Sequence, residues 1–504
     1  MRTTTVARIA ERIGARLEGD GTAEVGPDVV IDTRRATSGS LFIALPGERV
    51  DGHDFTEAAR VAGSRAVMAT RPTDADLPHL LVDDTREGLP ALARVVVARE
   101  RDRGMVTVAL TGSSGKTSTK DLLAQVLEDH GPTVSPVGSF NNEIGVPLTA
   151  CGVDEHTDFL VSEMGARGKG HIAWLTSIVP PDVAMVLNIG TAHLGEFGSR
   201  EAIAEAKGEI VEALGPDGWA VLNAADERVA GMAPRTRAHL AWFSPDADHR
   251  HPEADIEVWA GDVVADDLDR HSFTLHARVD GTTCEHPVSL RTLGAHQVAN
   301  AVAAAAAALA ALTSATGHRP DPAAVAASLS SATTRSPMRM ELHERADGLV
   351  VVSDCYNANP DSMAASLAAL GNILGRRRAA DPHTRGVAVL GDMLELGPDA
   401  PALHREVGAL AARSGFDLVL AVGEHAGDLA AGARAGGAES RVVTVEEAAR
   451  SIGWTSHDVL LVKASRALAL ERVAEQVLDL GGPSAAGLDF DGRPAVGEHE
   501  EARK

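Results

Sequence analysis

Short apolar runs alternate with helical stretches along most of the chain. In the first 85 residues, four such runs stand at 29–31, 41–45, 66–68 and 80–82. This alternation predicts a small α/β unit over residues 1–85. Residues 84–103 have one long helical pattern, with Asp84 or Thr85 as its N-cap, and are predicted to lead into the next unit.

From Val106 the runs become longer and more completely apolar. VTVAL predicts a strand, the Gly/Ser-rich stretch after it a turn, and STKDLLAQVLEDH a helix. Three more strand-like runs follow at 158–165, 182–190 and 219–226, separated by helical segments. Because buried strands that alternate with helices are typical of a parallel sheet, we predict one here.

Residues 253–292 have a different pattern. IEVWAGDVVAD and SFTLHARVDGTTCEHPVSL alternate apolar and polar residues around an Asp280-Gly281 turn, which predicts an antiparallel hairpin inserted in the central unit. An alanine-rich helix is expected from Asn300, ending at Gly317. Its apolar run is too short and too rich in alanine to span a membrane, so we predict a buried helix.

A third unit is predicted from residue 335. Its apolar runs are LVVVSDC, GVAVLGDM, DLVLAVGEH, RVVTV and DVLLVKAS, again separated by helical segments. The pattern is Rossmann-like but lacks a G-x-G-x-x-G loop. After residue 480 all periodicity is lost, which predicts disorder. We therefore expect an α/β protein of three domains with a tail, with the following limits: 1–85, 86–334, 335–480 and 481–504.

Composition and charge exclude several classes of function. The chain has 504 residues, is 44% hydrophobic and only 3% aromatic, so aliphatic side chains and alanine must fill its cores. A formal charge of -24 without a long Lys/Arg run argues against binding to nucleic acid or anionic lipid. The amphipathic N-terminal stretch lacks the apolar centre of a signal peptide. We expect a soluble, cytoplasmic protein that is not inserted in a membrane.

The three cysteines point to no special chemistry. Cys151, Cys284 and Cys355 are far apart and odd in number, which supports neither a disulfide framework nor a C-x-x-C metal site. Cys355 could be proposed as a nucleophile, but no His/Asp pairing in the sequence supports it. A free structural thiol is the preferred interpretation.

The stretch TGSSGKTSTK, residues 111–120, resembles a phosphate-binding loop. Gly112 and Gly115 stand only three apart, and Leu110 occupies the place where the common pattern has its first glycine. An apolar strand enters the loop and a helix leaves it, so backbone N–H groups and the positive helix end meet at one point. Lys116 can then reach terminal phosphates and the hydroxyl of Thr117 can bind Mg²⁺. The alternative is a turn that merely requires glycines.

Other candidates are ambiguous when taken alone. Glu163 ends a strand beside the loop strand, where a carboxylate either helps to hold Mg²⁺ or faces solvent. His193 ends the next strand, but a lone histidine is usually a local hydrogen-bonding group and magnesium seldom takes imidazole. Lys207 lies among alanines and glutamates, which is typical of a solvated helix face.

Nine motifs in one order give these residues a common meaning. They are TGSSGKTSTK, NNEIGVPLT, EMGARGKGHI, NIGTAHLGEFGS, AKGEI, GAHQVANAVAA, DCYNANPDSM, GDMLELG and VKASRALALE. Together they resemble the Mur ligases, ATP-dependent amide ligases that build the peptide stem of peptidoglycan. YNANPDSM and GDMLELG are most similar to members that add D-alanyl-D-alanine to UDP-N-acetylmuramoyl-tripeptide through an acyl phosphate. The stretch DTRRATSGSLFIALPGERVDGHDF resembles the UDP-binding unit of the family.

The resemblance implies a role for each candidate. Glu163, His193, Thr117 and a carbamylated Lys207 are implied to hold magnesium, with two ions in all. Catalysis is implied for Lys116, Asn142, His193 and Lys207. ATP is implied to contact Gly112, Ser113, Ser114, Gly115, Lys116, Thr117, Ser118, Asn300, Arg339 and Asp354. The uridine nucleotide is implied to contact Thr33, Arg34, His53 and Phe55. The enzyme is expected to act as a monomer on cytoplasmic precursors.

Some positions depart from the family pattern, and alternatives stay open. Ser353 and Cys355 replace an acid and a serine, Met338 stands where glycine is common, and the late GSR is ASR here. The N-x-D-D motif is NAADE. These departures concern contacts to nucleotide from the third domain. Another amino-acid-adding Mur ligase is less favoured because D-N-P-R/K is absent. A folylpolyglutamate synthase would lack the uridine unit, and a GTP switch would carry N-K-x-D.

Overall fold

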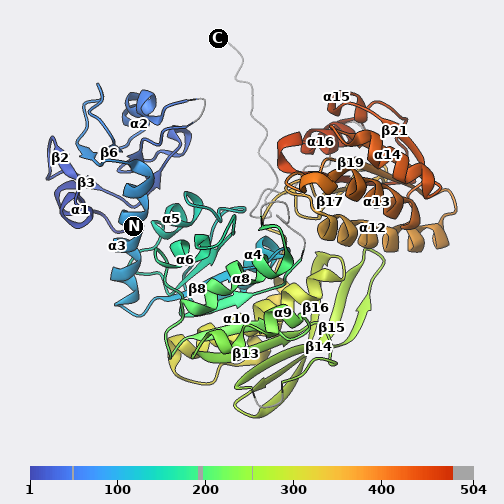
Figure 1. Ribbon diagram of the computed structural model, residues 1–504, viewed down its shortest axis with the longest axis horizontal. Helices are drawn as coiled ribbons and strands as arrows, with labels where there is room; N and C mark the ends of the chain where they lie inside the picture. The colour runs from blue at the N-terminus through green and yellow to red at the C-terminus, as the bar shows by residue number, and fades with distance from the viewer. Residues whose placement is uncertain (48–49, 191–196, 252–253, 481–504) are drawn as a thin grey trace, which may run out of the picture.

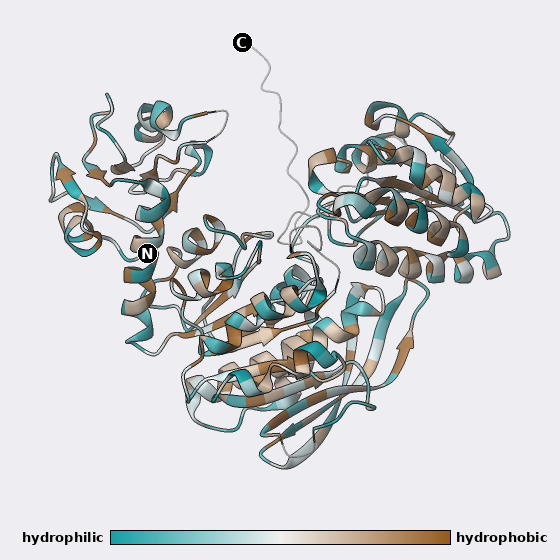
Figure 2. Cartoon of the chain, in the orientation of Figure 1, coloured by the Kyte–Doolittle hydropathy of each residue, from teal (hydrophilic) through white to brown (hydrophobic). Residues whose placement is uncertain are grey.

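The computed structural model describes residues 1–47, 50–190, 197–251 and 254–480. The tail predicted to be disordered, 481–504, lies outside the described residues. The chain forms three α/β units, each built on its own sheet, as the sequence predicted. In Figure 1 the N-terminal unit (blue) and the C-terminal unit (orange) lie on opposite sides of the central unit (green and yellow). Figure 2 shows hydrophobic colouring along the strands inside the sheets.

The N-terminal unit contains a five-stranded sheet in the order β2-β7-β6-β5-β4. Its strands are β2 (Arg16–Glu18), β4 (Val29–Val30), β5 (Leu41–Ile43), β6 (Ala66–Ala69) and β7 (His79–Leu81). The four apolar runs of the sequence are thereby confirmed as parallel strands, whereas β2 is an antiparallel edge that no apolar run announced. The other elements are β1 (Thr4–Thr5), β3 (Glu24–Val25), α1 (Val6–Ile13), η1 (Thr33–Arg35), η2 (Gly52–Phe55) and α2 (Thr56–Val61).

The long helix α3 (Thr85–Arg101) connects this unit to the next. The carboxylate of Asp84 accepts a hydrogen bond from the backbone N–H of Arg86 at 2.8 Å, which confirms the predicted N-cap. One face of α3 is buried through Leu89 and Leu92, and the helix contacts α1 and α5 (Gly145–Ala150). It therefore shares one hydrophobic core with both units.

The central unit has a nine-stranded sheet in the order β16-β15-β14-β13-β12-β11-β8-β10-β9. The strands are β8 (Val106–Thr111), β9 (Thr133–Val134), β10 (Phe159–Glu163), β11 (Val183–Val186), β12 (Trp219–Asn223), β13 (His239–Ser244), β14 (Ile256–Ala265), β15 (Arg270–Val279) and β16 (Thr282–Leu293). The seven strands from β9 to β14 in this order pair in parallel. This confirms the prediction for β8, β10, β11 and β12, whereas β9 and β13 were missed and the parallel pairing of β14 was not predicted. The last three strands are antiparallel, but they continue the same sheet and are not a separate insertion.

Helices cover both faces of this sheet. They are α4 (Lys116–Glu128), α5, α6 (His171–Thr176), α8 (Arg200–Glu212), α9 (Glu227–Ala230), α10 (His296–Thr316) and α11 (Pro322–Ser331), with η3 (Ala233–Arg235). Helix α10 begins at His296, four residues before the expected start, and ends at Gly317, whose φ of 64° gives the left-handed C-cap. The expectation that the run is too short to cross a membrane was wrong, because the helix is long and apolar enough by length and composition. However, 78% of its most apolar window is buried inside the protein, as expected for the predicted buried helix.

The C-terminal unit has a six-stranded sheet in the order β17-β18-β22-β19-β20-β21. Its strands are β17 (Glu341–Glu344), β18 (Val350–Ser353), β19 (Arg385–Gly391), β20 (Leu418–Val422), β21 (Glu439–Val442) and β22 (Asp458–Lys463). All pair in parallel except β17, a half-buried edge strand that the sequence pattern missed. The helices are α12 (Pro360–Ala380), η4 (Gly397–Asp399), α13 (Ala400–Arg413), α14 (Ala426–Ala435), α15 (Val445–Ala448), η5 (Arg466–Leu468) and α16 (Glu471–Asp479).

Candidate active site

The Gly/Ser loop joins β8 to the first turn of α4, the geometry expected for a phosphate site. Gly115 has φ 77°, and a Cβ there would lie 2.5 Å from Oδ1 of Asn300, so only glycine fits. The loop is held from the other side by Asn188. Its Oδ1 accepts hydrogen bonds from the backbone N–H groups of Ser113 and Ser114, at 3.1 and 3.0 Å. The loop backbone is thus fixed before any ligand arrives.

Two lysine ammonium groups meet behind this loop. Nζ of Lys116 donates to the carbonyl oxygen of Gly112 at 2.7 Å, and Nζ of Lys207, from α8, donates to the same oxygen at 3.1 Å. Burial lowers the pKa of Lys116 below its ordinary value, opposed by Glu163 and assisted by Arg339. Burial and the charge of Lys116 lower the pKa of Lys207 well below its usual range. Lys207 therefore does not lie on the solvated face that its helix pattern alone favoured.

A short chain of polar side chains connects the loop to the end of β10. The Thr117 hydroxyl lies 3.4 Å from Oγ of Ser139, which donates to Oε1 of Glu163 at 2.9 Å. Nδ2 of Asn141 donates to the same Oε1 at 2.7 Å. The second carboxylate oxygen of Glu163 is buried and has no hydrogen-bond partner among the described residues. Such a carboxylate beside a threonine hydroxyl fits the oxygen ligands that Mg²⁺ prefers.

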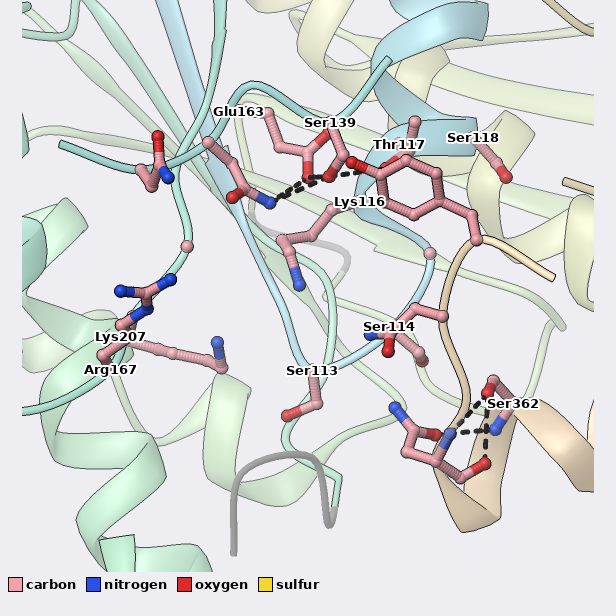
Figure 3. Close-up of a pocket in the computed structure, with 18 of the residues that line it drawn as sticks. Ser113, Ser114, Lys116, Thr117, Ser118, Ser139, Glu163, Arg167, Lys207 and Ser362 are labelled. Carbon is pink, nitrogen blue, oxygen red and sulfur yellow. Dashed lines mark hydrogen bonds between the residues drawn. The ribbon is translucent and has the colours of Figure 1, made fainter. Parts of the chain in front are cut away.

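The C-terminal unit closes the other side of a cleft of about 250 Å³. Nη2 of Arg339 donates to Oγ1 of Thr117 at 3.2 Å, and the Arg339 guanidinium lies 4.4 Å from the ring centroid of Tyr356. Figure 3 shows the side chains of Lys116 and Lys207 extending toward one another, with Glu163 and Ser139 beside Thr117. The cleft is lined by Ser113, Ser114, Gly115, Lys116, Thr117, Ser118, Ser139, Asn141, Asn142, Glu163, Gly165, Ala166, Arg167, His171, Lys207, Arg339, Tyr356, Asn357, Asn359, Ser362 and Glu395.

Three implied nucleotide contacts, Gly112, Asn300 and Asp354, lie outside the lining of this cleft. Asn300 is buried behind Gly115, where its Oδ1 accepts from the Thr119 hydroxyl at 3.2 Å. Asp354 is buried beneath the C-terminal wall, where its carboxylate accepts from Nζ of Lys463 and from the Ser366 hydroxyl. Both side chains support the cleft walls in this structure.

Asn142 lines the cleft, but its side chain also has a local role. Its Oδ1 accepts from the backbone N–H groups of Ile144 and Gly145, at 3.2 and 2.8 Å, at the start of α5. His193 belongs to residues 191–196, which lie outside the described residues.

The four residues implied to bind uridine lie in the N-terminal unit, and none lines the cleft of Lys116. Arg34 pairs with Asp32, and its side chain is 88% exposed. His53 is buried, and its ring nitrogens contact Asp51 and Thr70. Thr33 begins the turn η1. Phe55 is 41% exposed, so an apolar ring is accessible beside this turn-rich surface.

Comparisons with known proteins give these features a family. Models described as the Mur ligase family catalytic domain, the Mur ligase middle domain and the Mur ligase glutamate ligase domain match residues 28–97, 110–308 and 338–466. A UDP-N-acetylmuramoyl-tripeptide--D-alanyl-D-alanine ligase of Mycobacterium bovis is 40% identical, over 94% of this chain and 97% of that protein. The chain belongs to the Mur ligase family.

Solved structures of Mur ligases are similar over most of their length. A crystal structure of MurF from Acinetobacter baumannii has a TM-score of 0.77 at 28% identity, covering 95% of this chain and 99% of that one. MurF from Thermotoga maritima in complex with ADP has a TM-score of 0.68 at 28% identity, covering 90% of this chain and 97% of that one. This Mur ligase is therefore an ATP-dependent, amide-forming enzyme.

The structure shows the local setting of two positions at which this Mur ligase departs from the family pattern. Met338, where the family commonly has glycine, has φ 58°, a left-handed backbone conformation that glycine adopts without strain. Cys355 is fully buried, and burial raises the pKa of its thiol to about 11. A thiol that stays protonated at neutral pH is not a nucleophile, which agrees with the structural interpretation.

Sequence reasoning missed several residues that build the site of this Mur ligase. Ser139 and Asn141 hold Glu163, and Asn188 holds the loop, yet only Asn142 was chosen from the NNEIG motif. Asn188 follows the buried strand β11 at the carboxyl edge of the sheet, whereas Ser139 and Asn141 lie in a half-exposed loop that has no such signal. From the third domain, Tyr356 and Glu395 also line the cleft.

Proposed function

We propose that this Mur ligase joins D-alanyl-D-alanine to UDP-N-acetylmuramoyl-tripeptide in the cytoplasm, as a step of peptidoglycan precursor synthesis. The observation that supports it most is the cleft in which Lys116, Thr117 and Glu163 of the central unit face Arg339 of the C-terminal unit. The relatives named for this reaction, at up to 40% identity over nearly the whole chain, support the choice of substrates. We keep 1–85, 86–334 and 335–480 as the proposed domains for UDP substrate, ATP and ligation.

The reaction must first make the tripeptide carboxylate reactive, since its oxygen is a poor leaving group. A carboxylate oxygen attacks the γ-phosphorus of ATP, the bond to the β-phosphate oxygen breaks, and ADP leaves. The acyl phosphate then reacts with the amino group of D-alanyl-D-alanine. The C–N bond forms and the C–O bond to phosphate breaks. Of the two protons that the acceptor ammonium gives up, one ends on phosphate and one in solvent.

Residues of this chain bring the anions together. The N-terminus of α4 and the loop backbone bind the phosphates, and Lys116 neutralises the charge that develops at the transferred group. Arg339 contributes a second positive charge from the C-terminal unit, beside Thr117. Ser139 and Asn141 orient Glu163, and Asn142 fixes the start of α5 beside the phosphates. Positioning of this kind converts an encounter of three substrates into a step within one complex.

We propose that Thr117 and Glu163 hold Mg²⁺, with His193 and a modified Lys207 completing the sites for two ions. The buried, unpartnered Oε2 of Glu163 supports this assignment. When bound, magnesium offsets the phosphate charge and polarises the transferred group.

We further propose that Lys207 is carbamylated. A lysine with a strongly lowered pKa supplies the neutral amine that captures CO₂, with loss of one proton. The carbamate is an anion and is attracted to Lys116, whereas the ammonium is repelled by it.

One assay tests the reaction. The protein, proposed to be a monomer, is incubated with ATP, Mg²⁺ and UDP-N-acetylmuramoyl-tripeptide, and D-alanyl-D-alanine is compared with single amino acids as acceptor. We expect phosphate release and a pentapeptide product only with the dipeptide. Release that is equal with and without both substrates would contradict the proposal. A second assay compares ATP with GTP, because strict GTP binding without ligation would favour a switch protein.

A further inference from the structure

The loop after β19, residues 392–396, is held by buried polar side chains. The backbone N–H of Met393 donates to Nε2 of His404 at 2.8 Å, and that of Leu394 donates to Oγ of Ser465 at 3.0 Å. His404 is fully buried, and burial lowers its pKa, so the ring stays neutral and can accept this bond. Successive backbone groups of an irregular segment are thus fixed from within the C-terminal unit.

Asp392 anchors the start of the same loop. Its carboxylate accepts hydrogen bonds from the backbone N–H groups of Glu424 and His425, at 2.7 and 2.9 Å. Its backbone carbonyl oxygen accepts a hydrogen bond from the backbone N–H of Ser465 at 3.0 Å. The side chain of Asp392 is almost completely buried. A buried carboxylate that accepts two backbone N–H groups is typical of a segment whose shape must be fixed.

The fixed loop presents two side chains outward. Leu394 is 47% exposed, and Glu395 lines the cleft that contains Lys116 and Thr117. Glu395 has φ 65°, a left-handed conformation that is unfavourable for a non-glycine residue. Strain of this kind persists where surrounding contacts enforce it, and it gathers at functional sites. The conformation of Glu395, together with its place in the cleft, indicates a role in binding.

The charges of the cleft indicate what Glu395 can bind. Among the described lining residues, Lys116, Arg167 and Arg339 carry positive groups and two are acids, Glu163 and Glu395. Glu163 lies on the central wall and is bonded to Ser139 and Asn141. Glu395 has interactions of its own as well, and it is the carboxylate that the C-terminal unit brings to this cleft. ATP and the tripeptide carboxylate are both anionic, and Mg²⁺, proposed to lie at Thr117 and Glu163, is one positive group that enters the cleft. The ammonium of the dipeptide is the other.

We propose that Glu395 binds the α-ammonium group of the acceptor dipeptide, while Leu394 offers apolar surface to an alanine methyl. This inference rests on the proposed ligase function. A carboxylate next to an ammonium forms charge-assisted hydrogen bonds, and the rigid loop sets the direction of the nitrogen toward the acyl carbon. Glu395 acts here by charge and position, and the protons leave as described for the reaction.

The test compares Glu395→Gln with the unmodified protein and with Glu406→Gln, an exposed glutamate of α13. We expect the KM for D-alanyl-D-alanine to rise about tenfold or more in Glu395→Gln, as for loss of a bond to a charged group. The KM for ATP should not change. The amount of acyl phosphate trapped by hydroxylamine should not change either, because its formation needs no acceptor. Propionyl-D-alanine, which lacks the amino group, should inhibit both proteins with equal Ki.

Glu395→Gly separates binding from folding. Glycine relieves the left-handed strain, so this variant should melt at a higher temperature than the unmodified protein and still show the raised acceptor KM. An unchanged acceptor KM in both variants would overturn the proposal. A raised KM for ATP alone would also overturn it, because it would assign Glu395 to the nucleotide. A Ki for propionyl-D-alanine that rises together with the KM for D-alanyl-D-alanine would overturn it too. If the unmodified protein makes no dipeptide-dependent product, the ligase function itself fails, and the acceptor role with it.

Discussion

Lys116 and Lys207 donate to one and the same acceptor, the carbonyl oxygen of Gly112, behind the phosphate-binding loop. Only 3% of Lys207 is exposed, so water does little to separate the two positive charges. An unmodified Lys207 therefore lowers the free energy of unfolding, and the size of this effect can be measured.

Replacing Lys207 by methionine should stabilise the protein and abolish its activity. Methionine fills the same space without a desolvated amine, and each kcal/mol gained raises Tm by about 2–4 °C in a unit of this size. The pKa of Lys207 is lowered in the folded state, so folding releases a proton below pH 10.5. The unmodified protein therefore gains stability relative to Lys207→Met as pH rises from 7 toward 10. Thermal unfolding across this range measures the difference.

Lys169→Met is the control for this experiment. Lys169 is exposed and pairs with Glu205, and its pKa is raised by that carboxylate. Its replacement should leave Tm nearly unchanged at pH 7. Equal Tm values for Lys207→Met and Lys169→Met would contradict the cost assigned to the buried amine. Carbamylation of Lys207 would reduce the difference in Tm between Lys207→Met and the unmodified protein. Buffers freed of CO₂ should therefore enlarge this difference.

Replacing Lys207 by alanine should nearly abolish ligation, and a short carboxylic acid should partly restore it. Alanine leaves a space beside Gly112, and acetate or formate can occupy it with the negative charge that a carbamate would supply. The measurement is product formation against acid concentration at constant ionic strength, with chloride as the control anion. Normal activity in Lys207→Ala, without added acid, would show that the carbamate has no role.

Replacing Asn141 by alanine should weaken magnesium binding without removing a ligand. Asn141 donates to Oε1 of Glu163 and thereby helps to fix the carboxylate, whose Oε2 is buried and has no hydrogen-bond partner among the described residues. Loss of such an orienting bond typically costs 10–100-fold in metal affinity, so about this increase is expected in the Mg²⁺ needed for half-maximal activity. Paramagnetic resonance of Mn²⁺ bound with ATP gives the affinity directly. An unchanged metal affinity would mean that Ser139 alone fixes Glu163.

Buried strands and the loop were predictable because each leaves a local signal. Apolar runs identified every parallel strand of the C-terminal unit, although the run at 441–445 overlaps only the last residues of β21. Edge strands such as β17 were missed, since a half-buried edge needs few apolar side chains. The antiparallel strands were recognised, but no local pattern reveals that β14 pairs with β13 and so extends the sheet.

The residues of the candidate site also fall into two groups, those that a local pattern predicts and those that depend on contacts between distant segments. Lys116 and Thr117 follow from the loop pattern, whereas the burial of Lys207 depends on how α8 packs behind β8, which its alanine- and glutamate-rich sequence does not show. Only the family resemblance nominated it. Glu163 was correctly placed at the strand end. Its partners Ser139 and Asn141 come from a different segment, the loop between β9 and α5. Contacts between distant segments carry no local signal.

Replacing Asp354 by alanine should destabilise the C-terminal unit. Its carboxylate is bonded to Nζ of Lys463, which is 1% exposed, and to the Ser366 hydroxyl. Removing one partner of a buried ion pair leaves the other charge uncompensated and costs about 3–5 kcal/mol. Urea unfolding measures this loss, with Asp399→Ala as an exposed control. Unaltered stability with a raised KM for ATP would instead support the nucleotide contact that the family resemblance implies.

Replacing Gly115 by alanine should weaken ATP binding through two separable effects. The new Cβ would lie 2.5 Å from Oδ1 of Asn300, and a φ of 77° is unfavourable for alanine by about 1–2 kcal/mol. Asn300→Ala removes the close contact but leaves the backbone strain. In a double-mutant cycle, the loss caused by Gly115→Ala should therefore be smaller in the Asn300→Ala background, though not zero. Nucleotide affinity measured by calorimetry decides the outcome, and perfectly additive losses would show that the two residues do not interact.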